Sequence, residues 1–388
     1  MKFAIYGVNF YNKGAELMLY AAKQQIQQWN QNNILCANLE IGSFKQRKEV
    51  GINHLTWIAP RTSIRHKKAP FINFIAGLFP KPIRKYYDIT LESEVDIILD
   101  ASGFAFSDQW GHAKTETMAK RCIRWKKQGK KIILLPQAFG PFTNGRIKSA
   151  FIEILNNSDI VFARDEISYE YINNLSVPIN NVKIAPDFTN LLQGIEPEYI
   201  NNLSGKPCII PNQRMLDKTS SQVSDTYISF LVSSLEHLLA KGFEPFILIH
   251  ESNDYELGMH LQAQVSKPVS VIKEDNPLYL KGILGKCYLV IGSRFHGLIS
   301  SLSQGTPCLG TGWSHKYQML FKNYNCTDLL IDVADDINQN LSKLDLMIQE
   351  PTRGKIIQAV QEGGRHQKAL SKQMWSEVQN LLEVGKNK

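Results

Sequence analysis

The feature of this sequence that most constrains its fold is a regular alternation of short β-type runs with longer helical stretches. Runs rich in Val, Ile, Leu and Phe recur from the N-terminus onward, and polar stretches with helical periodicity separate them. This alternation is typical of parallel sheets joined by crossover helices. The strands expected in the first half lie at about 2–8, 33–41, 94–100, 131–136, 159–163 and 182–185, with helices near 15–30, 114–128, 145–156 and 166–175.

A second alternation begins after residues 190–206, a stretch rich in turn formers that lacks a clear period. Its expected strands lie near 207–211, 245–250, 269–272, 287–292, 307–310 and 328–331, with helices near 222–241, 255–264, 276–285, 295–304 and 315–323. The sequence therefore predicts an α/β protein with two Rossmann-like, doubly wound domains, at 1–195 and 205–334. Residues 335–388 read as a helical tail of one or two helices that could pack back on the first domain.

Composition excludes several classes of protein. With 43% hydrophobic and 21% charged residues, the chain is neither disordered nor a small disulfide-rich domain. Its six cysteines form no CxxC pair, which predicts buried free thiols rather than a zinc or redox site. No carboxylate cluster calls for a metal, so we expect no metal and no cofactor. No apolar run is long enough to cross a bilayer, and the start does not read as a signal peptide. These features predict a cytoplasmic protein.

The formal net charge of +8 favours anionic partners. The basic residues are most noticeable in segment 63–87, which has an apolar middle and no acidic residue. This composition fits peripheral contact with a membrane, and a helix buried against the sheet with solvated basic ends would explain it equally. Nucleic acid is not expected, because basic and aromatic residues are not concentrated together elsewhere. The basic residues of the segment are Arg65, Lys67, Lys68, Lys81, Arg84 and Lys85.

Ligands of doubly wound sheets bind at the carboxyl ends of strands, so the loops after strands are the places to look for a site. The loop after the first strand holds Asn12 and Glu16 at the start of a helix, where backbone N–H groups could bind an anion. The loop after strand 94–100 offers polar and aromatic side chains that could form a pocket wall for a polyhydroxylated ligand, although a buried Trp with satisfied neighbours is the alternative. These are Asp108, Gln109, Trp110 and His112.

Arg164 follows directly on the apolar strand 159–163. A guanidinium in this position needs an anionic partner. That partner could be Asp165, Glu166, or the carboxylate or phosphate of a substrate, and Asp187 could also pair with such a base.

The most distinctive local pattern is residues 289–299, where an apolar strand runs through a Gly-Ser turn into Arg294 and His296 at a helix start. A helix N-terminus, a fixed cation and an imidazole converge there, so the group could hold an anion and move a proton. Lys316, at the start of a later helix, is a further candidate anion ligand.

Seven short motifs occur in order along residues 1–323. They are Asn12-x-Gly14-Ala15-Glu16, Asp100 to Gly103, Gln137-x-x-Gly140-Pro141, Ala163-Arg164-Asp165 with Ser168, Pro186-Asp187, Ser293-Arg294-Phe295-His296, and Gly305-x-Pro307 followed by Lys316. Together they resemble the polysaccharide pyruvyl transferases. The sequence differs from the family pattern at Ala101-Ser102-Gly103, where a glycine run is more usual, and at Ala15, where Asp is common.

The resemblance implies two Rossmann-like units facing a cleft, as in GT-B enzymes. It implies transfer of a pyruvyl group from phosphoenolpyruvate to two hydroxyls of a sugar in a surface polysaccharide precursor, forming a ketal and releasing phosphate. Acceptors in the family are often carried on a polyprenyl lipid, which would fit contact of 63–87 with the inner membrane face. A GT-B glycosyltransferase using a nucleotide sugar and a non-catalytic scaffold of polysaccharide assembly are the alternatives.

Roles for individual residues follow from the resemblance together with the loop chemistry. We expect Arg164, Arg294, Phe295 and Lys316 to bind phosphoenolpyruvate and His296 to act as general acid. The acceptor is expected to contact residues of the first domain, namely Asn12, Glu16, Asp108, Gln109, Trp110 and His112.

Overall fold

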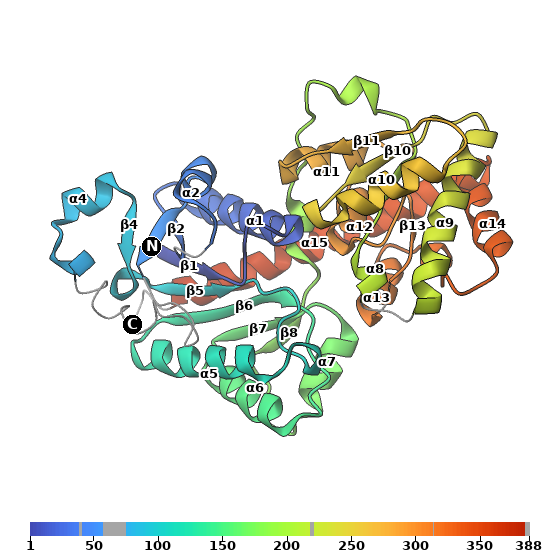
Figure 1. The fold of residues 1–388 in the computed structure, drawn as a ribbon. Helices are drawn as coiled ribbons and strands as arrows, with labels where there is room; N and C mark the ends of the chain where they lie inside the picture. Colours follow the sequence, from blue (N-terminus) through green and yellow to red (C-terminus); the bar gives the residue numbers. More distant parts are fainter. Residues whose placement is uncertain (39–40, 57–74, 218–220, 313, 385–388) are drawn as a thin grey trace. The chain divides into compact units, whose positions relative to one another are not determined.

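The computed structural model describes residues 1–388 except 39–40, 57–74, 218–220, 313 and 385–388 (Figure 1). The chain forms two compact units, and the first is built from two separate stretches of sequence. Unit 1 comprises Met1–Phe188 and Ser371–Lys388, and unit 2 comprises Thr189–Leu370. Both are parallel α/β units, as the alternation of strands and helices predicts.

Unit 1 contains an eight-stranded sheet in the order β4-β3-β2-β1-β5-β6-β7-β8, with every pair parallel. Its strands are β1 (Lys2–Tyr6), β2 (Ile34–Asn38), β3 (Asn53–Thr56), β4 (Ile89–Leu91), β5 (Ile97–Asp100), β6 (Lys131–Gln137), β7 (Ile160–Ala163) and β8 (Val182–Ile184). Its helices are α1 (Lys13–Trp29), α2 (Phe44–Val50), α4 (Lys81–Tyr86), α5 (His112–Lys127), α6 (Gly145–Asn157), α7 (Glu166–Asn173) and the end of the last helix, α15 (Thr352–Val384).

Helices cover both faces of this sheet, and alternation along β1 shows how. The ring centroids of Phe3 and Trp29 of α1 lie 6.3 Å apart, and those of Trp29 and Trp375 of α15 lie 5.6 Å apart. Helices α1 and α15 therefore share one face of the sheet. Tyr6 points to the other face, where its ring lies 4.9 Å from Trp125 of α5. Because successive side chains of a strand point to opposite faces, both faces of β1 are buried in apolar side chains.

Unit 2 contains a five-stranded parallel sheet in the order β11-β10-β9-β12-β13. Its strands are β9 (Cys208–Ile210), β10 (Phe246–Ile249), β11 (Ser270–Lys273), β12 (Val290–Gly292) and β13 (Cys308–Gly310). Its helices are α8 (Arg214–Asp217), α9 (Ser221–Ala240), α10 (Tyr255–Gln264), α11 (Pro277–Lys286), α12 (Phe295–Leu302), α13 (His315–Asn323), α14 (Ile337–Ile348) and the first part of α15.

The structure differs from the sequence prediction in several places. Strands β3 and β4 of unit 1 were not among the expected strands. The expected strand at 328–331 is a 3-10 turn at Thr327–Leu329, followed by a single bridge from Leu330 to Gly310. The predicted domain limits also differ from the observed units. Gly194 packs against Gly282, and the N–H of Ile195 donates to Leu278, so the expected linker already belongs to unit 2. The tail forms two helices, α14 and α15, and from Ser371 onward α15 belongs to unit 1.

All six cysteines are buried and free, as predicted. No helix in the described part of the chain is long and apolar enough to cross a membrane. Of the basic and apolar segment at 63–87, residues 63–74 lie outside the described residues.

Candidate functional site

The carboxyl edge of the unit 2 sheet holds a dense group of polar side chains. Strand order reverses between β9 and β12, and such a reversal is where doubly wound sheets bind ligands. The segments that leave these two strands are tied together, because Asn212 Nδ2 donates to the carbonyl of Ser293 at 2.9 Å. The hydroxyl of Tyr317 donates to the same carbonyl at 2.9 Å, and Tyr227 shares a hydrogen bond of 2.9 Å with Ser293 Oγ. Hydrogen bonds from three different segments therefore fix the turn before α12.

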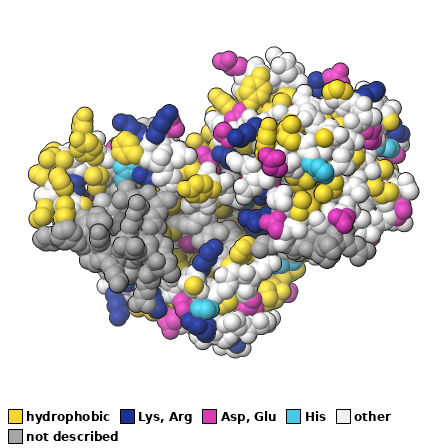
Figure 2. Space-filling view, viewed as in Figure 1, with side chains coloured by type: hydrophobic (Ala, Val, Ile, Leu, Met, Phe, Trp, Pro, Cys, Tyr) yellow, Lys and Arg dark blue, Asp and Glu magenta, His cyan; other side chains and the backbone are white. Residues whose placement is uncertain are grey.

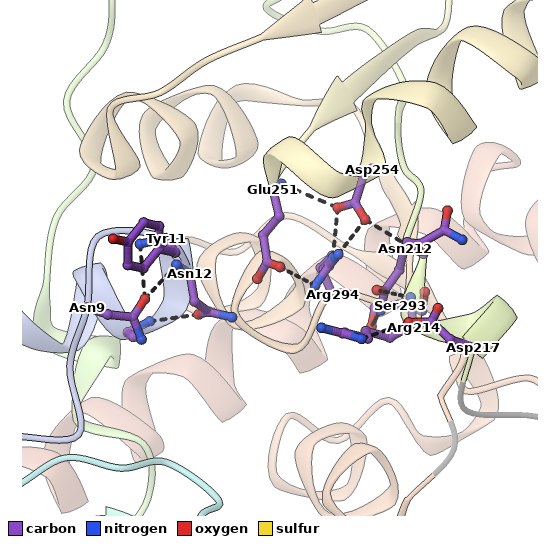
Figure 3. A network of polar contacts seen from close by, with 12 residues as sticks. Asn9, Tyr11, Asn12, Asn212, Arg214, Asp217, Glu251, Asp254, Ser293 and Arg294 are labelled. Carbon is purple, nitrogen blue, oxygen red and sulfur yellow. Dashed lines mark hydrogen bonds and ion pairs between the residues drawn. The ribbon is translucent and has the colours of Figure 1, made fainter. Parts of the chain in front are cut away.

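Arg294 follows this turn and lies between two carboxylates (Figure 3). Its Nε donates to Asp254 Oδ2 at 2.8 Å, a second nitrogen pairs with Asp254 Oδ1, and its third nitrogen lies 2.7 Å from Glu251 Oε2. Asp254 is fully buried and also accepts from the backbone N–H of Gln213 at 2.9 Å. The arginine is thus fixed in orientation, and at least one of its nitrogens faces each carboxylate.

The carboxyl of Glu251 is a group in this cluster whose ionisation is perturbed. Burial raises its pKa above the ordinary range, the positive charge of Arg294 opposes that shift, and the negative charge of Asp254 adds to it. Arg214 and His296 are also close enough to lower the pKa. Glu251 therefore lies close to Arg294, Arg214 and His296.

Phe295 connects the remaining predicted residues of unit 2. The ring of His296 lies perpendicular to it, with centroids 5.5 Å apart. Lys316, from the start of α13, places its Nζ 5.2 Å from the centroid of the Phe295 ring and 5.1 Å from that of Tyr317. Arg294, Phe295, His296 and Lys316 thus form one neighbourhood, although α12 and α13 are separated by a strand.

Arg164 belongs to unit 1 and also faces a carboxylate. Its guanidinium lies 3.3 Å from Asp187 Oδ2, and both side chains are buried. Asp165 instead caps α7, where it accepts from the N–H of Ser168 at 2.7 Å. Of the partners considered from sequence, the structure therefore gives Arg164 an ion pair with Asp187.

The unit 1 sheet has its own reversal of strand order, between β1 and β5. Gly7 leaves β1 with φ +81°, and a Cβ built there would lie 2.4 Å from the backbone of Ser102, so only glycine allows this approach. Asp100 ends β5 and accepts from Gln137 Nε2 at 3.0 Å and from the Ser102 hydroxyl at 3.0 Å. Burial raises the pKa of Asp100, while these hydrogen bonds lower it, and the net direction is upward.

The residues expected to bind an acceptor occupy two loops of unit 1. In the first loop, Asn12 caps α1 by accepting from the N–H of Ala15 at 2.9 Å, and Glu16 pairs with Lys13 at 3.0 Å in a buried position. Both side chains therefore already have structural contacts.

In the second loop, the carboxylate of Asp108 accepts from the Thr143 hydroxyl at 2.7 Å and from the N–H groups of Thr143 and Asn144. Gln109 and Trp110 are exposed, and the Trp110 ring has Lys114 Nζ 5.5 Å from its centroid. His112 begins α5. Asp108 thus orders this loop, and Gln109 and Trp110 remain the accessible members.

The family assignment rests on a comparison with protein-family models. Residues 12–315 match the model of the polysaccharide pyruvyl transferases. The chain belongs to this family. The matched stretch runs through both sheets and includes the cluster of Glu251, Asp254, Arg294 and His296.

A known relative of this pyruvyl transferase family member is the amylovoran biosynthesis protein AmsJ of Erwinia amylovora, 21% identical over 262 residues. The alignment covers 62% of each chain, so the chain spans less than two thirds of that relative's length.

Solved structures show the fold. A UDP-N-acetylglucosamine 2-epimerase from Listeria monocytogenes, described as putative, superposes with a TM-score of 0.62, 11% identity and coverage of 99% of this chain and 96% of the other. Anabaena Alr3699/HepE, solved with UDP-glucose, gives a TM-score of 0.60, 13% identity and coverage of 98% and 99%. These likenesses support two parallel-sheet α/β domains with GT-B-like neighbours.

Sequence reasoning missed Glu251, Asp254 and Asn212. All three follow strands that were expected near 207–211 and 245–250, in the segments Pro211–Arg214 and His250–Asp254. The signal in the sequence is a pair of acids, Glu251 and Asp254, within four residues after His250 at the end of an apolar strand.

Proposed function

We propose that the protein transfers the pyruvyl group of phosphoenolpyruvate to two hydroxyls of one sugar in a surface polysaccharide precursor. The observation that carries this proposal is the family match across residues 12–315. The polar cluster at the carboxyl edge of the unit 2 sheet supports it, because it combines cationic side chains with an imidazole. Arginine and lysine, here Arg294 and Lys316, are residue types that bind the carboxylate and phosphate of a small anion.

In the proposed reaction His296, in its protonated form, gives a proton to the methylene carbon of phosphoenolpyruvate, which becomes a methyl group. The adjacent carbon becomes cationic, and one sugar hydroxyl adds to it with loss of its proton. The bond from this carbon to the phosphate oxygen then breaks, and the second hydroxyl adds with loss of its proton. The products are a cyclic pyruvate ketal and hydrogen phosphate. Of the two protons that the hydroxyls lose, one restores protonated His296 and the other is taken up by the departing phosphate.

Glu251 has a place in this scheme. Its carboxyl lies 2.7 Å from a guanidinium nitrogen of Arg294, two residues before His296 in the chain. We assign Glu251 as a positioning residue that holds Arg294 beside His296.

The first test of the proposal needs no acceptor. A ligand that binds only the folded protein raises its melting temperature by mass action. We expect phosphoenolpyruvate to raise the melting temperature and UDP, GDP and CMP sugars to leave it unchanged. Because removal of Arg294 would leave two carboxylates without their cation, Lys316→Met is the first binding variant, and it should reduce the shift.

A second test addresses the chemistry. With glycosides that offer neighbouring hydroxyls, wild-type protein should release phosphate and increase the acceptor mass by one pyruvate less one water. His296→Gln should lose about 100-fold or more of this turnover and keep the thermal shift with phosphoenolpyruvate. A shift with a nucleotide sugar alone would favour a glycosyltransferase instead, and no shift with either ligand would favour a non-catalytic scaffold.

A further inference from the structure

The segment 75–87 of unit 1 exposes an unusual amount of apolar surface. Sixteen large hydrophobic side chains are exposed in the described part of the chain, and six of them lie within these thirteen positions. Figure 2 shows hydrophobic side chains gathered over the region of α4. A soluble protein scatters exposed hydrophobic residues singly, so a cluster of this kind indicates a contact surface. Its members are Ile75, Leu78, Phe79, Ile83, Tyr86 and Tyr87, with exposed fractions of 38%, 66%, 49%, 42%, 81% and 52%.

One buried arginine determines which face of α4 points outward. Arg84 lies 2.6 Å from Glu94 Oε1 through one guanidinium nitrogen, and its Nε donates to the carbonyl of Phe79 at 3.2 Å. This side chain therefore attaches the helix to the body of unit 1. Since each residue of a helix advances by about 100°, the side opposite Arg84 is formed by Pro82 and Tyr86, both of which are exposed.

The two flanks of this outward face differ in chemistry. Ile83 lies on one flank, and Lys81 and Lys85, four residues apart, lie on the other. Both lysines are exposed, and no acidic residue occurs between positions 75 and 87. The surface thus combines aliphatic and tyrosine side chains with positive charge, and negative charge is absent from the whole segment.

This combination matches the interface of an anionic membrane. Tyrosine rings favour the headgroup level, aliphatic side chains enter the acyl boundary, and lysines pair with acidic headgroups. A protein partner would be expected to meet aromatic and arginine anchors with a polar rim, whereas here the single arginine is turned inward. We propose that the surface formed by residues 75–87 binds peripherally to membranes that contain anionic lipid.

Vesicle co-sedimentation of the full chain tests this proposal. We expect wild-type protein to pellet with vesicles of phosphatidylglycerol and phosphatidylcholine, to bind pure phosphatidylcholine weakly, and to lose binding as salt is raised. The double variant Leu78→Gln, Tyr86→Gln should bind at least about tenfold more weakly. The double variant Lys81→Gln, Lys85→Gln should bind the anionic vesicles at least about tenfold more weakly, and its binding to pure phosphatidylcholine should not change.

The control changes equally exposed hydrophobic residues in unit 2. Tyr255→Gln, Met259→Gln on α10 alters side chains that are 40% and 37% exposed and should bind vesicles like wild type. All variants should keep the wild-type melting temperature, since the altered side chains are exposed. Pyruvyl transfer to a soluble acceptor should also be unchanged in these variants. Failure of the membrane proposal can therefore be distinguished from failure of the proposed reaction.

Three outcomes would overturn the proposal. Wild-type protein could remain in the supernatant with every vesicle. The Leu78→Gln, Tyr86→Gln variant could pellet as well as wild type. Sedimentation velocity could instead show a dimer that this variant dissociates, with no vesicle binding by either protein, in which case a second copy of the chain covers the surface.

Discussion

Arg294 Nε donates to Asp254 Oδ2 at 2.8 Å, and both side chains are buried. This contact joins the loop after β10 to the loop after β12, across β9 in the sheet order. A buried charge that loses its partner is costly, whereas an exposed ion pair contributes little. The local geometry of the proposed donor site should therefore depend on Asp254.

Asp254→Asn tests this dependence. The substitution leaves Arg294 paired with Glu251 alone, so we expect the free energy of unfolding to fall by about 3 kcal/mol. Calorimetry of the full chain should show the loss in the transition of unit 2. The matched control is Asp217→Asn, which removes an exposed pair with Arg214 at 2.7 Å and should cost less than about 1 kcal/mol. Equal losses in both variants would contradict a structural role for the buried pair.

The buried carboxyl of Asp100 predicts a dependence on pH. Burial raises its pKa, although hydrogen bonds from Gln137 and Ser102 oppose that shift. Between its unfolded and folded pKa the folded state holds a proton that the unfolded chain has released, so the carboxyl lowers stability as pH rises through this range. Asparagine does not titrate. The melting temperature of Asp100→Asn relative to wild type should therefore rise as pH rises above the ordinary carboxyl pKa.

Asp108 supplies a control of opposite sign. Its slight burial would raise its pKa, but hydrogen bonds from Thr143 and Asn144 outweigh that effect and lower it. Its contribution to stability is present above the ordinary carboxyl pKa and is lost as pH falls. Relative to wild type, the melting temperature of Asp108→Asn should fall as pH rises toward the ordinary carboxyl pKa and stay level above it. A rise of the Asp108→Asn curve below the ordinary carboxyl pKa, or a flat Asp100→Asn curve above it, would show that the corresponding assignment is wrong.

Trp375 should be a main source of stability for unit 1. It is 2% exposed and packs edge-on against Trp29 and Phe188, each at 5.6 Å between ring centroids. Trp375→Ala should cost about 3–5 kcal/mol. Leu346→Ala, at a position that is 46% exposed on α14, should change stability by no more than about 0.5 kcal/mol. In calorimetry, Trp375→Ala should lower the unfolding temperature of unit 1. A lower unfolding temperature of unit 2 alone would contradict the assignment of Trp375 to the core of unit 1.

The thiols should be unreactive in the folded protein. Burial raises the pKa of Cys36 and of Cys326 to about 12, and all six cysteines are buried. Because the thiolate is the reactive form, a disulfide reagent should label no thiol rapidly in native protein and all six after denaturation. Rapid labelling of one thiol before denaturation would identify a residue that is more accessible than the structure indicates.

Strands with strong apolar runs could be predicted from sequence, and polar ones could not. Ile97–Asp100 and Lys131–Gln137 lie close to their expected positions because both faces of a parallel sheet demand Ile, Leu and Val. Asn53–Thr56 was missed, since its His54 is buried by accepting a hydrogen bond of 2.7 Å from Arg47, a contact that propensity cannot anticipate.

The candidate site was partly predictable for a related reason. Arg294 and His296 stand out because they follow a strand and begin a helix. Glu251 and Asp254 become neighbours of Arg294 through sheet order, which places β10 beside β9 and β9 beside β12. The pattern of one segment does not reveal that order. Sequence could therefore identify the cation of the cluster and not the carboxylates that hold it.

The discontinuity of unit 1 has a consequence for synthesis on the ribosome. All of Thr189–Leu370 emerges before the residues from Ser371 onward that complete the core of unit 1. Since domains fold as their residues become available, unit 2 can finish while Trp29 and Phe188 still lack their partner. Until the residues from Ser371 onward are in place, the apolar surface around Trp29 and Phe188 is incomplete.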